Sequence, residues 1–194
     1  MASLKEKIAY ALGDAAAGGI VWKVMSIAFP LFFTNVFGLS FADAAVLMLV
    51  ARMFDVVTDP LMGSLADRTQ SRFGTYRPWL IFGAIPFGLI FALLLYTPDF
   101  GPVGKRIYAY TLYLLMMAVY TMVNVPYGSL LGVMTDDDNE TNQFSSFRMV
   151  GAYAMGFITL LSFPYLQKMV GGSDAHQYAV IGAMLGVVAA VMTL

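Results

Sequence analysis

The sequence contains no cysteine and few charged residues. The absence of cysteine excludes disulfides, zinc–thiolate sites and thiol catalysis. Charged residues make up only 12% of the chain, whereas soluble domains carry about 25%. The formal net charge of −1 indicates neither nucleic acid nor an acidic partner. The chain also lacks a Gly-rich phosphate loop and a nucleophile–base motif, so we do not expect an enzyme.

Apolar residues are abundant instead. They make up 59% of the 194 residues, and the mean hydropathy is +0.73. An α-helix needs roughly 20 apolar residues to cross a bilayer. Six segments meet this length, at residues 9–33, 43–65, 77–97, 105–128, 144–166 and 175–194. Short connections join them, so residues 1–194 are predicted to form an all-α membrane protein of six transmembrane helices, without a separate soluble domain.

Lysine and arginine in the short connections predict how the chain is oriented. Positively charged loops usually stay in the cytoplasm. With a cytoplasmic N-terminus, that side carries five such residues and the outer side carries three. They are Lys5, Lys7, Arg68, Arg72 and Arg77 inside, and Lys105, Arg106 and Lys168 outside. We therefore predict a multi-pass protein with its N-terminus in the cytoplasm.

The sequence ends at GVVAAVMTL, inside an apolar run with no polar flank. Transmembrane helices normally carry interfacial residues after their last apolar turn. We therefore expect this chain to be half of something longer. Either a second bundle or a second copy of the chain would complete it.

The second span carries three charges in the stretch ARMFDVVTDPLMG. Arg52, Asp55 and Asp59 are spaced i, i+3 and i+7, which places them on one helix face. Ionisable groups at bilayer depth cost roughly 2.5–3.5 kcal/mol and therefore face a partner or a wet cavity. Two carboxylates one turn apart repel unless a cation neutralises them. Asp55 and Asp59 are predicted to bind Na⁺ or a proton, although an ion bridge between helices is the alternative.

Further oxygen atoms lie near this carboxylate pair. Hard cations take several oxygen ligands. The Thr58 hydroxyl is one candidate, and the Val56 carbonyl, which Pro60 deprives of its helical donor, is another. Arg52 is expected to pair with Asp55.

The fourth span carries a second polar stripe. Tyr113, Tyr120 and Tyr127 repeat every seven residues, beside Thr121 and Asn124. Such a stripe is either helix packing or a surface on which a sugar ring stacks and forms hydrogen bonds. Both interpretations remain open at this point.

Two charges lie in the first span. Lys23 is halfway along it and too far from either interface for its ammonium to reach water. We expect it to pair with Asp55 or Asp59, or to contact an anionic substrate. Asp14 lies near the start of the helix, where a carboxylate favours the positive end of the helix dipole. Trp22 is expected to face lipid.

The segment from Asp55 to Trp79 reads D-x-x-x-D-P-x-x-G-x-x-x-D-R-T-x-S-R-x-G, followed by R-P-W. FFTNVFGLS, VNVPYGSL and SSFR are further matches. Together they resemble the glycoside–pentoside–hexuronide:cation symporters of the major facilitator superfamily, over nearly the whole chain. The resemblance implies twelve helices in two bundles, with this chain as the N-terminal bundle. It also implies alternating access and a bacterial inner membrane.

The resemblance also implies roles for individual residues. It places the cation at Asp55, Thr58, Asp59 and Thr121, although Thr58 stands where the melibiose carrier of this family has an asparagine. It places Arg148 at the sugar. Lys23, Tyr120, Asn124 and Tyr127 are further substrate-binding candidates, and they come from the charge and the polar stripe described above. The loop motif that gates the transporter would be Gly63, Asp67, Arg68, Arg72 and Arg77.

The sugar side departs from the melibiose carrier. Asn124 replaces an aspartate, Gly128 replaces an aromatic residue, and a lysine–aspartate pair is missing near residues 17–19. Lys23 has no counterpart. We therefore expect symport of a sugar or glycoside, with a pentoside such as a β-xyloside favoured. The alternatives are an anionic substrate such as a hexuronide or a lysolipid, or an inactive half-transporter that serves as a scaffold. No cofactor is expected besides the coupling cation.

Overall fold

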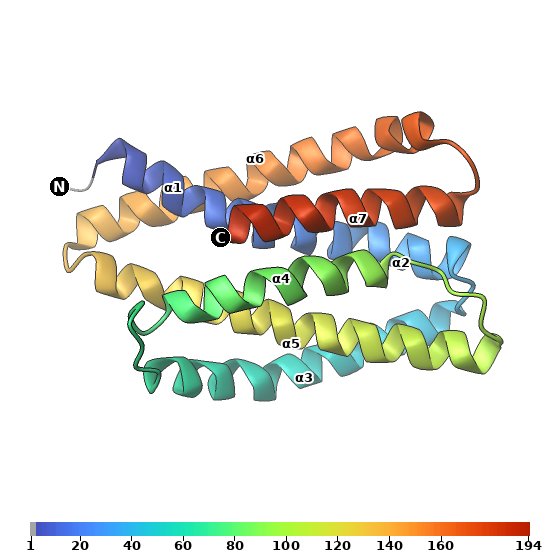
Figure 1. Ribbon diagram of the computed structural model, residues 1–194, viewed down its shortest axis with the longest axis horizontal. Coiled ribbons are helices and arrows are strands. Elements are labelled where there is room, and N and C mark those ends of the chain that lie inside the picture. The colour runs from blue at the N-terminus through green and yellow to red at the C-terminus, as the bar shows by residue number, and fades with distance from the viewer. Residues whose placement is uncertain (1–2) are drawn as a thin grey trace.

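A computed structural model describes residues 3–194, which form a bundle of long helices without strands in this range (Figure 1). The first long helix comprises five consecutive segments. They are α1 (Leu4–Asp14), η1 (Ala15–Val21), η2 (Val24–Ala28), α2 (Phe29–Leu31) and η3 (Phe32–Val36). The other helices are α3 (Phe41–Asp67), α4 (Arg77–Leu94), α5 (Pro102–Met134), α6 (Asp138–Val170) and α7 (Asp174–Thr193). Each predicted span coincides with one of these six helices.

Length and composition alone identify five membrane-spanning candidates within residues 3–194. They are residues 4–36, α4, α5, α6 and α7. The sixth helix, α3, has 27 residues and is therefore about 40 Å long. It is long enough to span, but Arg52, Asp55 and Asp59 interrupt its apolar sequence. The predicted all-α architecture is confirmed, and α3 is the one helix whose polarity needs an explanation.

Helix ends follow local capping rules. Ser3 and Glu6 form a reciprocal capping box at the start of α1. The hydroxyls of Ser40 and Ser173 accept backbone N–H groups at the starts of α3 and α7. At the end of α6, Gly171 has φ of +64°, a backbone conformation that favours glycine. These caps fix where the helices begin and end.

The first long helix is not a regular α-helix. The segments η1, η2 and η3 have π-helical hydrogen bonds, in which each N–H bonds to the carbonyl five residues earlier. Pro30 lies within this helix, and its carbonyl accepts the Thr34 hydroxyl at 3.0 Å. Because π turns hold more residues than α turns, side chains along this helix do not follow the 3.6-residue period.

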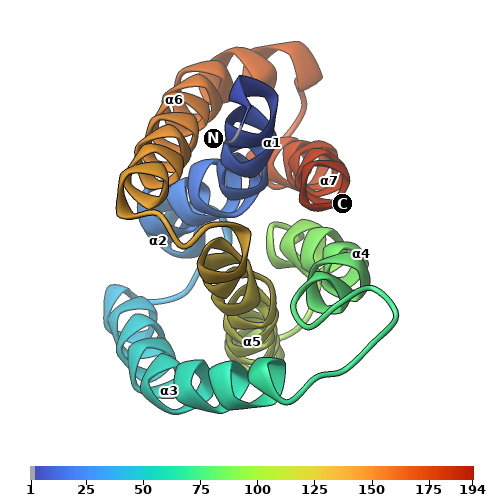
Figure 2. The same ribbon diagram turned by 90° about the vertical axis from the view of Figure 1, so that its left-hand side faces the viewer.

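Viewed end-on, the helices form two groups (Figure 2). The first long helix packs against α6 and α7, and α5 packs against α3 and α4. The contact between α4 and α7 joins the groups. At that crossing Gly88 and Gly186 face each other, and a Cβ added at Gly186 would lie 2.5 Å from the Gly88 carbonyl oxygen. Glycine at both positions therefore allows the two backbones to meet.

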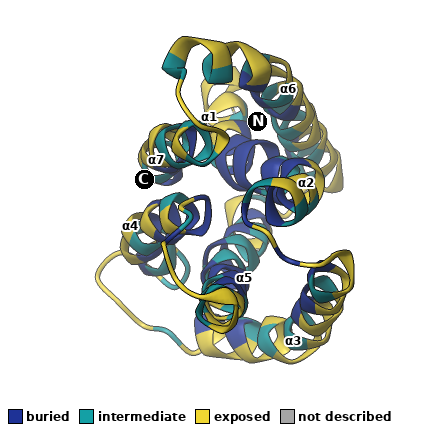
Figure 3. Cartoon of the chain, turned by 90° about the vertical axis from the view of Figure 1, so that its right-hand side faces the viewer, coloured by how far each residue is buried: buried dark blue, intermediate teal, exposed yellow. Residues whose placement is uncertain are grey.

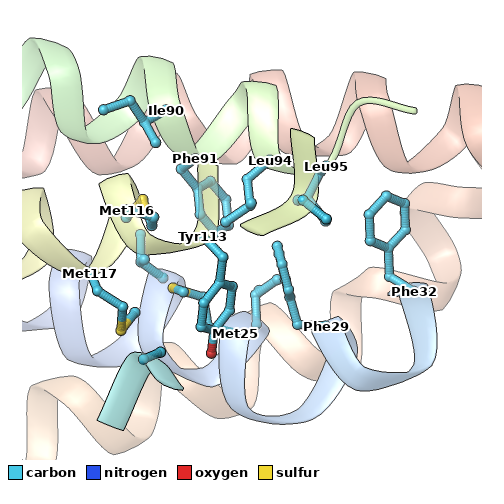
Figure 4. Close-up of a cluster of buried hydrophobic side chains, with 14 of the residues drawn as sticks. Met25, Phe29, Phe32, Ile90, Phe91, Leu94, Leu95, Tyr113, Met116 and Met117 are labelled. Carbon is cyan, nitrogen blue, oxygen red and sulfur yellow. The ribbon is translucent and has the colours of Figure 1, made fainter. Parts of the chain in front are cut away.

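Aromatic and methionine side chains fill the centre of the bundle. Phe29 and Phe32 of the first helix, Phe91 of α4 and Met116 of α5 are fully buried in one cluster (Figure 4). By contrast, the outer faces of α3 and α6 expose apolar side chains (Figure 3). Such faces suit lipid or another helical bundle.

The start of α1 and the connections at residues 68–76 and 135–137 lie at the same end of the bundle (Figure 1). Six consecutive spans require the connections to alternate between the two ends of the bundle, and every second connection lies at this end. Which end faces the cytoplasm stays a prediction.

Candidate cation and substrate site

A hydrogen bond across two helices defines the candidate cation site. The Thr121 hydroxyl of α5 donates to Oδ1 of Asp59 on α3 at 2.8 Å. One turn earlier on α3, Asp55 lies 3.7 Å from Arg52, measured from Oδ2 to Nη1. The predicted pairing of Arg52 with Asp55 is present. Asp55, Asp59 and Thr121 therefore converge at the α3–α5 contact.

These residues line a cavity of about 260 Å³ between the first helix, α3 and α5. Its walls are Trp22, Arg52, Asp55, Asp59, Tyr120, Thr121, Asn124 and Val125. The Trp22 ring closes one side, since Arg52 lies over it at 4.7 Å and the Tyr120 ring lies 5.3 Å away. The cavity thus combines carboxylates, an amide, a hydroxyl and two aromatic rings.

This set of groups suits a hard cation better than a transition metal. Within residues 3–194 no group of three acidic, cysteine or histidine side chains is placed to hold a metal. Two carboxylates and neutral oxygens are the ligand types that Na⁺ accepts by analogy with other hard cations. Either carboxylate could take up a proton instead. Aromatic rings beside an amide add groups that suit a sugar ring.

Thr58 is not brought into this cavity. Its hydroxyl donates to the Phe54 carbonyl on its own helix at 3.1 Å. A helical threonine often forms this bond to the carbonyl four residues earlier. The structure therefore gives no support to Thr58 as a cation ligand.

Trp22 and Lys23 point in different directions. The expectation that Trp22 faces lipid and the expected pairing of Lys23 with Asp55 or Asp59 are wrong, whereas contact of Lys23 with an anionic substrate stays a prediction. Trp22 lines the cavity and does not face lipid alone. The Lys23 ammonium lies 4.7 Å from the centre of the Tyr153 ring on α6, and its stem packs on Gly156. Successive residues on a helix project to different sides of it. Trp22 therefore faces α3 and α5, so that Lys23 faces α6 and does not pair with Asp55 or Asp59.

Arg148 lies beside the Tyr127 ring, and neither residue lines the cavity of Asp55 and Asp59. The Arg148 Nε donates to Oδ2 of Asp14 at 2.9 Å. The Tyr127 ring stacks on Tyr10 with 4.8 Å between centroids, and its hydroxyl donates to the Tyr10 carbonyl. The expectation that Asp14 only favours the helix end is wrong, because its carboxylate is buried in this ion pair.

Asn124 connects the two regions. It lines the cavity of Asp55 and Asp59 and also a neighbouring cavity of about 300 Å³ that includes Tyr10 and Tyr127. The three tyrosines of the heptad stripe therefore lie in three different environments. Tyr113 packs in the aromatic core, Tyr120 lines the cavity of Asp55 and Asp59, and Tyr127 bonds to the first helix.

The loop motif lies at the end of the bundle that carries the N-terminus. Asp67 accepts the Tyr76 hydroxyl at 2.8 Å, and this bond raises the pKa of Tyr76 because it favours the neutral phenol. Gly74 has φ of +92°, which allows the turn back into α4. Gly63 lies on α3 facing Val125 of α5. The remaining three motif residues, Arg68, Arg72 and Arg77, are exposed at this end.

Comparison with known proteins identifies the family. A family model described as MFS/sugar transport protein matches residues 9–194. The chain belongs to this family. The predicted resemblance to sugar symporters of the major facilitator superfamily is thereby confirmed.

Three relatives illustrate the similarity. YagG of Escherichia coli strain K12, named as a candidate glycoside/cation symporter, is 46% identical over 183 residues, which cover 94% of this chain and 39% of YagG. The inner membrane symporter YicJ of the same strain is 43% identical over 172 residues, covering 89% of this chain and 37% of YicJ. The isoprimeverose transporter of Lactiplantibacillus pentosus is 30% identical over 195 residues, covering 99% of this chain and 40% of that protein.

The chain thus spans about two fifths of the length of these relatives. Membership of the MFS/sugar transport family, together with the long apolar helices, makes it a multi-pass membrane protein.

Two residues lie where the sequence does not predict them: Trp22 lines the cavity beside Asp55 and Asp59, and Asp14 is buried in its ion pair with Arg148. The signal for Asp14 was present in the sequence, because an aspartate between Gly13 and a run of alanines has no local partner. Nothing in the sequence pointed to Arg148 as that partner, since 134 residues separate the two.

Proposed function

We propose that this chain is the N-terminal bundle of a cation-coupled symporter for a neutral glycoside, with a pentoside favoured. The observation that carries the proposal is the bond from Thr121 to Asp59 beside Asp55, in a cavity that also holds Trp22 and Asn124. The names of the glycoside/cation and isoprimeverose relatives support the same substrate class. A second bundle, or a second copy of this chain, would supply the other half of the cavity.

In this proposal the cation enters between Asp55 and Asp59. Its positive charge removes the repulsion between the two carboxylates and stabilises the contact of α3 with α5. The same contact positions Tyr120 and Asn124, which would stack on and bond the sugar. A cation that improves sugar binding in this way is itself bound more tightly when sugar is present. The two bundles would then rock around the loaded site.

Arg52 gives the empty site a way to remain neutralised. Its guanidinium lies 3.7 Å from Asp55 and is largely exposed beside the cavity. Without a cation, Arg52 would move closer to the carboxylates. Both its contact with the Trp22 ring and its ion pair are therefore expected to change when the cation binds.

A transport assay on the protein expressed from its complete gene tests the proposal. Reconstituted into liposomes, it should accumulate 4-nitrophenyl β-D-xyloside when an inward Na⁺ or proton gradient is imposed. An ionophore that collapses the gradient is the control and should stop accumulation. Uptake that is the same with and without either gradient would contradict cation coupling.

A second candidate substrate is an anionic glycoside such as a hexuronide. The observation that favours it is Lys23, whose ammonium contacts a tyrosine ring and forms no ion pair with any residue in the described range. A membrane-embedded ammonium of this kind would attract a carboxylate.

Replacing Lys23 with glutamine separates the two substrates. If the substrate is anionic, Lys23→Gln should weaken uptake of 4-nitrophenyl β-D-glucuronide by about tenfold or more, because one charge-assisted bond is lost. Uptake of the neutral xyloside should change little. Lys168→Gln, at the exposed end of α6, is the matched control. Equal uptake of the glucuronide by Lys23→Gln and the unaltered protein would rule out this candidate.

A further inference from the structure

A buried ion pair joins the first long helix to α6. Within residues 3–194, Asp14 is the only charged residue in the buried class, at 7% exposure. Its partner Arg148 donates through Nε at 2.9 Å. A buried carboxylate is retained only with a partner, and this one commits a single N–H of Arg148. The guanidinium also forms a hydrogen bond with the Tyr10 side chain, and its remaining N–H groups are left for other acceptors.

The position of Arg148 depends on a gap in α5. A Cβ added at Gly128 would lie 4.0 Å from Nη1 of Arg148. The guanidinium carbon also lies 5.7 Å from the centre of the Tyr127 ring. Arg148 therefore crosses from α6 towards α5, where the small residue at position 128 leaves space. One third of its side chain remains exposed, so the group is anchored at Nε and accessible beyond it.

Two glycines and a tyrosine fix the Asp14 carboxylate. The Tyr127 ring covers Gly13, where an added Cβ would lie 2.6 Å from Cε2 of that ring. The Tyr127 hydroxyl binds the Tyr10 carbonyl in the same turn. On the other side, a Cβ added at Gly18 would lie 3.2 Å from Oδ1 of Asp14. The space at Gly13 and Gly18 on both sides of Asp14 therefore limits where its carboxylate can lie.

We propose that Asp14 is a positioning residue for sugar binding. It holds Arg148 at Nε, so that the Nη groups are presented to hydroxyl groups of the substrate. The inference rests on the proposed function. An arginine fixed at one end loses less side-chain freedom when it binds, which increases affinity. Asp14 itself does not touch the sugar, and its effect passes through Arg148.

The test uses Asp14→Asn in the protein expressed from its complete gene. At saturating cation, the Kd for 4-nitrophenyl β-D-xyloside should rise about tenfold, as expected when one preorganised charged contact is lost. The cation concentration that gives half-maximal stimulation should not change, since Asp55 and Asp59 are untouched. Asp43→Asn is the matched control, because Asp43 forms a comparable pair with Arg106 at 3.1 Å but lies in the first turn of α3 and does not contact Arg148. Its sugar Kd should equal that of the unaltered protein.

A double variant distinguishes positioning from simple structural support. If Asp14 acts through Arg148, adding Asp14→Asn to Arg148→Gln should not raise the Kd further. Arg148→Lys keeps a cation opposite Asp14, and thus the fold, but loses the forked geometry. It should raise the sugar Kd about as much as Asp14→Asn. If Asp14→Asn does not fold, the sugar Kd of Arg148→Lys decides whether the inference holds.

Three outcomes would overturn the inference. They are an unchanged sugar Kd in a folded Asp14→Asn protein, additive effects in the double variant, or unaltered binding by Arg148→Lys. If the unaltered protein binds no glycoside, the proposed function fails and this inference fails with it. If the unaltered protein binds the xyloside and the variants bind it with the same Kd, only the inference is wrong.

Discussion

Replacing Asp59 with asparagine is expected to abolish the stimulation of sugar binding by the cation. Asparagine has nearly the same shape and keeps an oxygen that can accept the Thr121 hydroxyl, so the α3–α5 contact should survive. The negative charge is lost, however. A unit charge about 4 Å from a cation contributes up to about 4 kcal/mol in a partly screened site. We therefore expect cation affinity to fall by about a hundredfold or more.

The measurement is a titration of sugar binding against Na⁺ concentration and against pH. In the unaltered protein, the Kd for the xyloside should fall as the coupling cation increases. In Asp59→Asn it should stay flat at the value for the cation-free state. Asp99→Asn, in the exposed connection before α5, is the matched control and should behave like the unaltered protein. A normal cation response in Asp59→Asn would refute the assignment of Asp55 and Asp59.

Replacing Gly88 with alanine is expected to cause the largest loss of stability. The added methyl would collide with the Gly186 carbonyl and lie 2.9 Å from the Cβ of Ala190. Backbone atoms cannot move aside as a flexible side chain can, so α4 and α7 would have to separate. Overpacking of this kind costs about 3 kcal/mol. Thermal unfolding in detergent should therefore show a clearly lower midpoint.

Gly132→Ala on α5 provides the contrast. No atom lies within 4 Å of a Cβ added there. Alanine is favoured over glycine in a helix by about 1 kcal/mol, so this variant should be neutral or slightly stabilised. If Gly88→Ala and Gly132→Ala unfold at the same temperature, the close approach of α4 and α7 is not what holds them together.

The main elements of this fold could be predicted because each depends on residues close together in the sequence. Six apolar stretches of sufficient length specify six helices. The spacing of Asp55 and Asp59 places them on one face of α3 without any knowledge of its neighbours. That Thr121 lies beside them came from the family resemblance and not from the spacing, since 62 residues separate Thr121 from Asp59.

The direction of side chains on the first long helix could not be predicted. Its π turns change the angle between successive side chains, so a regular helical period cannot show which way Trp22 and Lys23 face. The pair of Asp14 and Arg148 depends on space at Gly18 and Gly128, on two different helices. The space that a glycine leaves between two helices cannot be recognised from hydropathy or from residue spacing. Such features become visible only when the helices are assembled.

The polarity of α3 also affects how the chain enters the membrane during synthesis. Arg52, Asp55 and Asp59 together would oppose insertion of α3 as an isolated segment, because each charge costs roughly 2.5–3.5 kcal/mol near the bilayer centre. The hydroxyl that binds Asp59 belongs to α5, which leaves the ribosome only later. α3 should therefore stay beside the insertion machinery until α4 and α5 have been made. The charges that suit this helix to its role would thus delay its release into lipid.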